Sequence, residues 1–248
     1  MSHASATAVP DESAWLCEGC GYVLSGLPEG GRCPECGKLT SESGGNLRQP
    51  PLWERPNDAP WPVGLIKTTA EVILRPARFY RSLATRGSRD RSARFAQIHY
   101  ALASLFFGIA AWLHFDWVST ASTTLRIGDK VPWWDAVLLA VACFAFLVLM
   151  IRLAAWLTNW EATYRGYRLP LNVVQRGLDY HAAHYLPVAV IAVLSVLIYR
   201  ILLLQFPSRG VEWGMKYLYV ITAEVILAAG YLFKTYWTGM RNMMYASR

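Results

Sequence analysis

Four cysteines near the N-terminus have the spacing of a metal site. Cys17 and Cys20 form one Cys-x-x-Cys pair, and Cys33 and Cys36 form a second pair after twelve intervening residues. Two sulfurs at this spacing can bind one ion from a tight turn, and the glycine after each pair allows the positive φ at which the chain leaves the turn. Two such turns predict a closed tetrahedral site with four sulfur ligands. A segment this short buries too little apolar surface to fold alone, so metal binding must supply its folding free energy.

The ion expected at this site is zinc, with iron as the alternative. Four thiolates suit both ions. Disulfides would require an oxidising compartment, and residues 1–14 have neither the basic start nor the apolar core of a signal peptide. The two turns, CEGCGY and CPECG, resemble those of zinc ribbons and of the rubredoxin-like domain of rubrerythrins. This resemblance implies a zinc ribbon over residues 15–38 or a rubredoxin-type iron. Zinc is favoured because the chain shows no other obvious redox motif.

The rest of the chain has the composition of a membrane protein. Hydrophobic residues make up 54% of the 248 residues and charged residues only 17%, whereas soluble domains carry about a quarter charged residues. Since about 20 apolar residues cross the hydrocarbon layer, we expect four spans, at about 95–115, 134–157, 183–205 and 216–237. Tryptophans at the ends of these spans fit anchoring at headgroup depth. The sequence therefore predicts an all-α integral membrane helical bundle of about four transmembrane helices over residues 95–240.

Three further segments complete the expected organisation. Residues 1–14 are small and polar, which predicts a disordered tail. Residues 39–62 contain five prolines and two adjacent glycines, which predicts a flexible linker that leaves the metal-binding head mobile. In residues 63–94, apolar residues recur at helical spacing among arginines, so we expect amphipathic interfacial helices. Pro76 either breaks this run or starts a second short helix.

The net charge of +7 arises from arginines that lie beside the apolar stretches. Charge in this position sets topology or contacts anionic lipid, and it does not favour nucleic acid. The expected lipid contacts are Arg75, Arg78, Arg81, Arg89, Arg91 and Arg94. The connection between the second and third spans adds Arg165, Arg168 and Arg176. The positive-inside rule then places both termini and the metal site in the cytosol, in a plasma or inner membrane.

A second resemblance concerns the membrane part. The motif Arg-Pro-x-x-Phe-Tyr, from Arg75 to Tyr80, precedes a helical bundle and is similar to the lead-in of the Yip-type membrane domain. The tract YHAAHYLP, from Tyr180 to Pro187, is similar to the lead-in of a later span in that family. The resemblance covers about residues 62–240, although the family usually has one more span than we expect here. It implies a scaffold or trafficking-type membrane protein without established catalytic residues.

Polar residues inside the predicted spans are candidates for a function. Glu224 lies near the middle of the fourth span and Arg200 toward the outer end of the third, at similar depths if each residue rises about 1.5 Å. We expect a structural ion pair between them, with a proton or ion relay, or a protonated and hydrogen-bonded Glu224, as the alternatives. His181 and His184 share a helix face and form a weak candidate for a metal or haem site. The chain has no HExxH motif, nucleophile elbow or phosphate-binding glycine loop.

These features favour a non-enzymatic function. The leading hypothesis is a membrane-anchored adaptor or scaffold whose cytosolic zinc ribbon binds a partner protein. One alternative is a membrane redox protein with rubredoxin-type iron in the head and a histidine-ligated centre in the bundle. Another is a small transporter that uses Glu224. Metal analysis and a visible spectrum separate the first two hypotheses, because iron–thiolate is coloured and zinc–thiolate is not.

Overall fold

The computed structural model describes residues 14–28, 30–43, 48–85, 87–121, 131–206 and 210–246. Almost all of the tail that we expect to be disordered lies outside these ranges. Within them the regular structure is helical, and isolated bridges take the place of strands. The chain divides into two compact units, which we describe separately. Unit 1 comprises Met1–Ala96, Ile151–His181 and Thr235–Arg248, and unit 2 comprises Gln97–Met150 and Ala182–Lys234.

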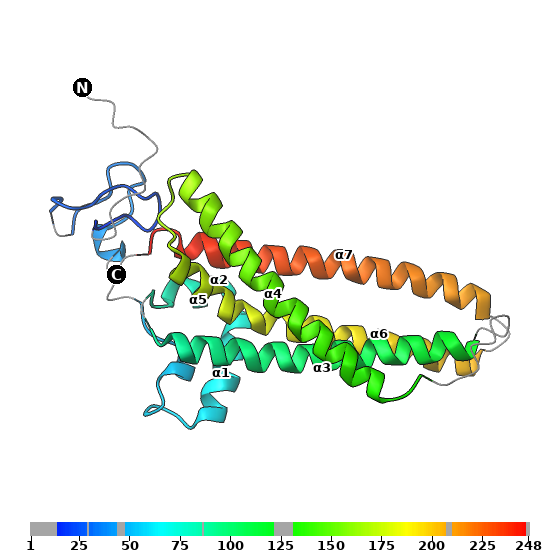
Figure 1. Ribbon diagram of the computed structural model, residues 1–248. Helices are drawn as coiled ribbons and strands as arrows, with labels where there is room; N and C mark the ends of the chain where they lie inside the picture. Colours follow the sequence, from blue (N-terminus) through cyan, green and yellow to red (C-terminus); the bar gives the residue numbers. More distant parts are fainter. Residues whose placement is uncertain are drawn as a thin grey trace. The chain divides into compact units, whose positions relative to one another are not determined.

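Within the described ranges, four segments are helical, long and apolar enough to cross a membrane, which confirms the predicted fold class. Their main helices are α3 (Arg89–Ala121), α4 (Trp134–Tyr164), α6 (Tyr185–Gln205) and α7 (Gly210–Met243) (Figure 1). Directly before α6 come α5 (Leu171–His181) and the short 3-10 helix η4 (Ala182–His184). Helices α3, α4 and α7 extend well beyond the about 20 residues that the hydrocarbon layer requires.

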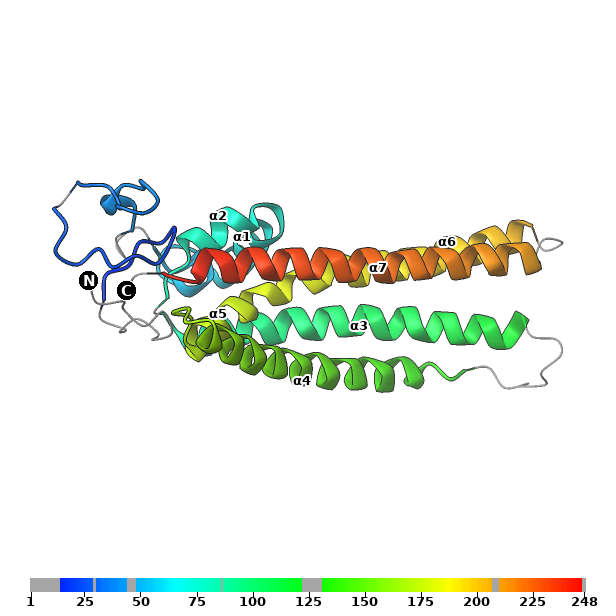
Figure 2. The same ribbon diagram turned by 90° about the horizontal axis from the view of Figure 1, so that it is seen from above.

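Unit 2 is a helical bundle. Residues of α3, α6 and α7 share an apolar core, formed by Ala110, Val196, Tyr199 and Tyr217. The rings of Tyr199 and Tyr217 stack with their centroids 3.9 Å apart. Helix α4 packs closely against α3 at Gly108, where a Cβ atom would lie 2.6 Å from the carbonyl oxygen of Ala136. Figure 2 shows these helices running alongside one another.

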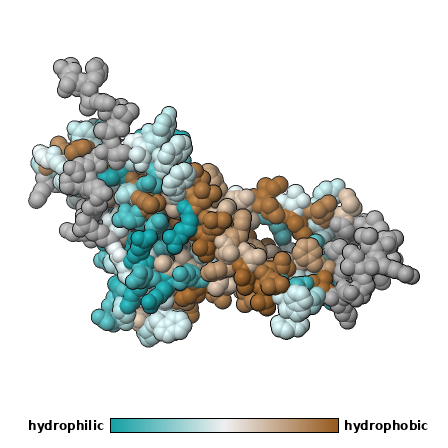
Figure 3. Space-filling view, viewed as in Figure 1, coloured by the Kyte–Doolittle hydropathy of each residue, from teal (hydrophilic) through white to brown (hydrophobic). Residues whose placement is uncertain are grey.

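The outer surface of unit 2 is apolar. Leu138 on α4 is 59% exposed and Leu227 on α7 is 72% exposed, and many other large apolar side chains of these helices are exposed as well. Figure 3 shows hydrophobic side chains gathered over the spans. An apolar surface of this extent is unfavourable in water and is expected in contact with lipid. The surface therefore fits a multi-pass membrane protein.

Unit 1 contains two short helices ahead of the spans. Helix α1 (Trp61–Leu74) ends before Pro76, which opens α2 (Pro76–Ser82) as one of the two predicted outcomes. The cause is local, because the residue before a proline is excluded from the helical region, and Arg75 has a φ of −138°. Helix α1 buries Val72 and exposes Trp61 and Leu74. This is an amphipathic pattern, and its position at a membrane interface stays a prediction.

Aromatic rings from several elements form the core of unit 1. Tyr180 lies with its ring centroid 5.2 Å from that of Phe79 and 5.0 Å from that of Phe95. The ring of Trp53 lies 6.2 Å from that of Phe95. Tyr80 is fully buried. These contacts join α2, α3, α5 and the segment before α1 into one packed unit.

Residues 39–62, predicted to be a flexible linker, contain ordered elements in the structure. The 3-10 helices η1 (Thr40–Ser43) and η3 (Leu52–Glu54) lie in this range, and α1 begins within it. The backbone N–H of Trp53 donates to Thr68 Oγ1 at 3.1 Å, and its indole N–H donates to the carbonyl of Arg91 at 2.7 Å. Prolines restrict the unfolded chain too, so ordering a proline-rich segment costs less conformational entropy than composition alone suggests.

Candidate metal centre and membrane cavity

The four cysteines come together on two similar turns of unit 1. An isolated antiparallel bridge closes each turn. Within the turns, the N–H of Gly21 donates to the carbonyl of Cys17 at 2.8 Å, and the N–H of Gly37 donates to that of Cys33 at 2.9 Å. Gly21 and Gly37 have φ values of +82° and +72°. These are the positive angles that the sequence predicts for the residue after each pair, and they are the reason for glycine there.

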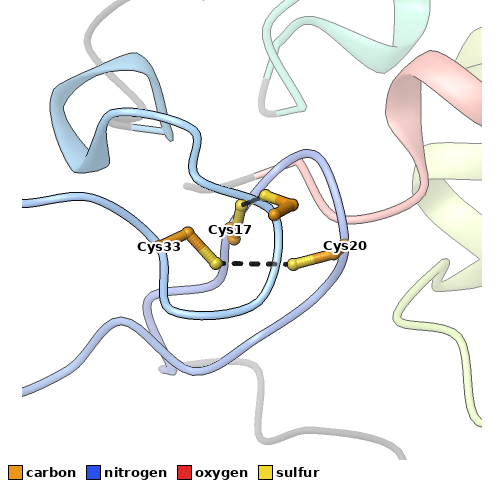
Figure 4. Close-up of side chains that lie close together, drawn as sticks. Cys17, Cys20 and Cys33 are labelled. Atoms are coloured by element: carbon orange, nitrogen blue, oxygen red, sulfur yellow. Dashed lines mark hydrogen bonds between the residues drawn. The ribbon is translucent and has the colours of Figure 1, made fainter.

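The sulfur positions fit one ion. All four Sγ atoms lie within 4.8 Å of one another. Cys17 and Cys36 sulfurs are 3.5 Å apart, as are those of Cys20 and Cys33 (Figure 4). A tetrahedral site with Zn–S bonds of about 2.3 Å places its sulfurs about 3.8 Å apart. Among the cysteines, histidines, aspartates and glutamates of the described residues, these four cysteines form the group whose ligand atoms lie close enough to hold one metal ion.

The environment of the thiols favours a bound cation. Burial alone would raise the pKa of Cys17, but hydrogen bonds from the backbone of Gly19 and Cys20 and from the neighbouring thiols lower that pKa to about 7. Burial raises the pKa of Cys20, because a thiolate loses hydration there, and its hydrogen bonds with the neighbouring thiols raise that pKa further. Four thiolates this close together repel one another, and a divalent cation would offset that repulsion.

A buried arginine joins the metal-binding turns to the rest of unit 1. Arg48 makes a bidentate ion pair with Glu18, which lies inside the first Cys-x-x-Cys pair, at 2.8 and 2.9 Å. The same guanidinium donates to the carbonyls of Tyr80 at 3.0 Å, Leu83 at 3.2 Å and Asn242 at 2.9 Å. One side chain therefore connects the first turn to α2 and to the end of α7. Neither member of the pair is marked by a sequence motif of its own as a structural link.

Two of the arginines that indicate topology also have structural contacts in unit 1. Arg176 is buried and forms an ion pair with Glu54 at 2.8 Å. Arg168 is buried and donates to the carbonyls of Ala14 and Ala246. The two carboxylates that pair with the buried Arg48 and Arg176, Glu18 and Glu54, lie in segments whose local sequence gives no sign of a buried charge.

The histidines proposed as a weak metal or haem site lie in different units. His181 Nε2 is 3.0 Å from Thr235 Oγ1 in unit 1. His184 Nδ1 is 2.7 Å from the Tyr231 hydroxyl in unit 2. Neither histidine belongs to a metal-ligand cluster among the described residues. Each has the hydrogen-bonded environment of a structural histidine.

Glu224 lies on the wall of a cavity of about 700 Å³ in unit 2. Its carboxylate accepts a hydrogen bond from the Ser195 hydroxyl, and the ion pairs found among the described residues do not include Arg200. The hydrogen bond between α6 and α7 thus takes the place of the expected ion pair. The reason is the helical period, because Arg200 follows Ser195 by five residues and so lies about 140° away around α6.

The cavity itself is mostly apolar. Residues of α3, α6 and α7 line it, among them Phe107, Ile191 and Val225. Its other polar groups are partnered, with His114 Nδ1 2.8 Å from the hydroxyl of Tyr217. A cavity of this size and composition has room for an apolar or amphiphilic molecule that makes a few polar contacts.

In comparisons with protein-family models, with curated proteins and with solved structures, nothing matches this chain. We therefore argue its function from the geometry of the metal centre and of the cavity.

Proposed function

We propose that this protein is a non-enzymatic, membrane-anchored adaptor whose zinc-bound head binds a partner protein. The observation that carries this proposal is the closed set of four cysteine sulfurs, all within 4.8 Å of one another. Structural zinc sites have four protein ligands, whereas catalytic sites keep one position for water or substrate. An ion held by Cys17, Cys20, Cys33 and Cys36 would have no such position. The head would then act through its outer surface.

The surface and the attachment of the head support this proposal. Tyr22 and Val23 follow the glycine after the first cysteine pair and are exposed apolar residues. The ion pair of Arg48 with Glu18 fixes this turn within unit 1. Binding of a partner to a fixed surface costs less conformational entropy than binding to a mobile segment, because the mobile segment has to be ordered first. The Yip-type resemblance of the membrane domain also implies a scaffold or trafficking function.

Site-specific photo-crosslinking in native membranes tests the adaptor function. A photo-reactive amino acid at Val23 should crosslink one protein, and the same group at the lipid-exposed Leu227 should not crosslink it. The crosslink should disappear in Cys33→Ser, which lacks a metal ligand, and persist in Cys143→Ser, which changes a cysteine of unit 2. Absence of any protein crosslink from Val23 would overturn the proposal. A crosslink that persists in metal-free Cys33→Ser would show that the metal-folded head is not the binding surface.

The proposal requires that the head face the cytosol. The bias of arginine toward residues 75–94 and toward the connection between the second and third spans supports cytosolic termini, in a plasma or inner membrane. Reporter fusions after Lys38, near residues 128, 166 and 210, and at the C-terminus should report inside, outside, inside, outside and inside. An external reporter after Lys38 would contradict this topology.

Zinc is the proposed ion and iron the alternative, since both accept four thiolates. Elemental analysis and the visible spectrum of protein purified from its native membrane distinguish them. We expect one equivalent of zinc and no absorption band from iron–thiolate charge transfer. One equivalent of iron with that band would replace the adaptor proposal with the redox alternative.

A second candidate function is the transport of a proton or small ion, and the position of Glu224 on the cavity wall favours it. Ionisable residues within spans often mark ion pathways. Flux into liposomes that contain the wild-type protein, lost in Glu224→Gln, would support transport. Flux no greater than that of empty liposomes would eliminate it.

A further inference from the structure

Unit 1 contains a polar cleft of about 740 Å³ beside the metal-binding turns. Segments that are distant in sequence form it. The first turn contributes Gly19, the second contributes Lys38, α2 contributes Arg78 and Arg81, and the end of α7 contributes Trp237 and Arg241. The cleft therefore depends on the tertiary structure of unit 1.

The charges that line this cleft are mostly positive. Its four cationic side chains are those of Lys38, Arg78, Arg81 and Arg241. None of them takes part in the ion pairs found among the described residues, which use other arginines. Of the two lining carboxylates, Glu18 is already bound by Arg48, which leaves Glu42. Four cations that share the cleft with this one remaining carboxylate leave an excess of positive charge, and a bound anion offsets the repulsion among them.

The chemistry of the lining favours a phosphate group over a simple anion. Three guanidinium groups offer planar sets of N–H donors, which match the oxygens of a phosphate in bidentate geometry. Tyr167 and Tyr245 also line the cleft, and Trp237, which is half exposed, adds an apolar surface. A tryptophan near the end of a span is typical of headgroup depth. A phospholipid, which carries a phosphate group close to its acyl chains, would find both kinds of contact here.

We propose that this cleft binds a phosphate-bearing anion, supplied either by a lipid headgroup or by a soluble phosphate compound. The six arginines that the sequence suggests as lipid contacts then differ in function. Arg78 and Arg81 belong to the cleft, whereas Arg89 donates to the Gln175 side chain at 3.1 Å. Arg94 is exposed and lies outside the cleft. This inference goes beyond the adaptor function and does not depend on the partner protein.

Calorimetric titration of the full-length protein in non-ionic detergent tests the proposal. The probes are inorganic phosphate and dioctanoyl phosphatidate, with dioctanoylglycerol as the uncharged control. The double variant Arg81→Gln/Arg241→Gln should weaken binding at least about tenfold, because it removes two charge-assisted contacts. The matched variant Arg94→Gln removes an arginine outside the cleft and should change binding by less than about twofold. Metal content and melting temperature establish that each variant is folded.

The outcomes separate the sources of the phosphate. Binding of phosphatidate alone, with this arginine dependence, assigns a lipid headgroup. Binding of inorganic phosphate that competes with phosphatidate assigns a site for the phosphate group itself, open to soluble compounds. Three results would overturn the proposal: no binding of either probe, equal binding of dioctanoylglycerol, or equal weakening by Arg94→Gln. The last result would mean that the arginines act as a general charged surface.

Discussion

Unit 1 and unit 2 satisfy their buried polar groups in different ways. In unit 1, buried arginines donate to carboxylates and carbonyls from several segments. The single side chain of Arg48 contacts Glu18 and three backbone carbonyls. In unit 2, polar side chains of neighbouring helices make single hydrogen bonds, such as those between His114 and Tyr217 and between Ser195 and Glu224. Long helices satisfy their own backbone groups, as a lipid environment requires. Short irregular segments leave carbonyls without partners, and a guanidinium with five donors can satisfy several at once.

The largest expected effect removes the metal from unit 1. Cys33→Ser should lose the bound ion and expose residues 15–38 to protease, because a structural zinc ion supplies about 10–16 kcal/mol of binding free energy in small zinc domains. The helical circular dichroism of the spans should remain. Cys143→Ser, in unit 2, should keep one equivalent of metal. Elemental analysis decides between these outcomes, and a full equivalent of tightly bound metal in Cys33→Ser would refute the four-cysteine site.

The next effect concerns the buried arginine that joins the segments of unit 1. Arg48→Met should lower the free energy of unfolding by about 3–5 kcal/mol, since it leaves the Glu18 carboxylate buried without its partner. Glu18→Gln in the Arg48→Met background should cost less than in the wild type, because the two residues interact. Thermal unfolding in detergent measures both quantities. If the two losses simply add, the ion pair does not stabilise unit 1 in the way that we describe.

A smaller effect compares the two glycines of the metal-binding turns. Both have positive φ, so an alanine at either position should cost about 1–2 kcal/mol. A Cβ at Gly21 would also lie 2.7 Å from the ring of Tyr245, whereas nothing lies within 4 Å of one at Gly37. Gly21→Ala should therefore lower the melting temperature more than Gly37→Ala. Equal losses would show that the first turn does not pack against Tyr245.

The smallest effect is expected in unit 2. Glu224→Gln keeps an acceptor for the Ser195 hydroxyl and should cost about 1 kcal/mol or less. Arg200→Met should act independently, so the double variant should show the sum of the two losses to within about 0.5 kcal/mol. Melting temperatures of the three variants test this additivity. Recovery of stability in the double variant would favour the ion pair that the sequence alone suggests.

Local sequence determined the features that depend on short-range chemistry. The spacing of Cys17, Cys20, Cys33 and Cys36, with glycine after each pair, predicted the cluster because two ligands on one turn need only local backbone geometry. The four spans followed from composition, because each helix satisfies its own hydrogen bonds and meets lipid independently of the others. Pro76 predicted the break between α1 and α2 for the same local reason.

One element with a readable local pattern was missed. Helix α5 carries Leu171, Val174 and Leu178 at helical spacing, and it begins after Pro170. Its buried residues include Tyr180, which belongs to the aromatic core of unit 1. This stretch is short and has polar residues between its apolar ones, so its helical pattern is weaker than that of the third span that follows it.

Only the tertiary structure decided which charges are buried and which are free. Composition treats all arginines alike, yet Arg48 and Arg176 are buried in ion pairs while Arg78 and Arg81 line an open cleft. The partners of these side chains come from segments far apart in the sequence, as Arg48 and the carbonyl of Asn242 show. Within the proline-rich segment, Arg48 and Glu54 pair with such distant partners. Glu224 accepts a hydrogen bond from Ser195, because the rotation of α6 places Arg200 on another face of that helix. Long-range contacts of this kind depend on how the chain packs, and no local pattern encodes them.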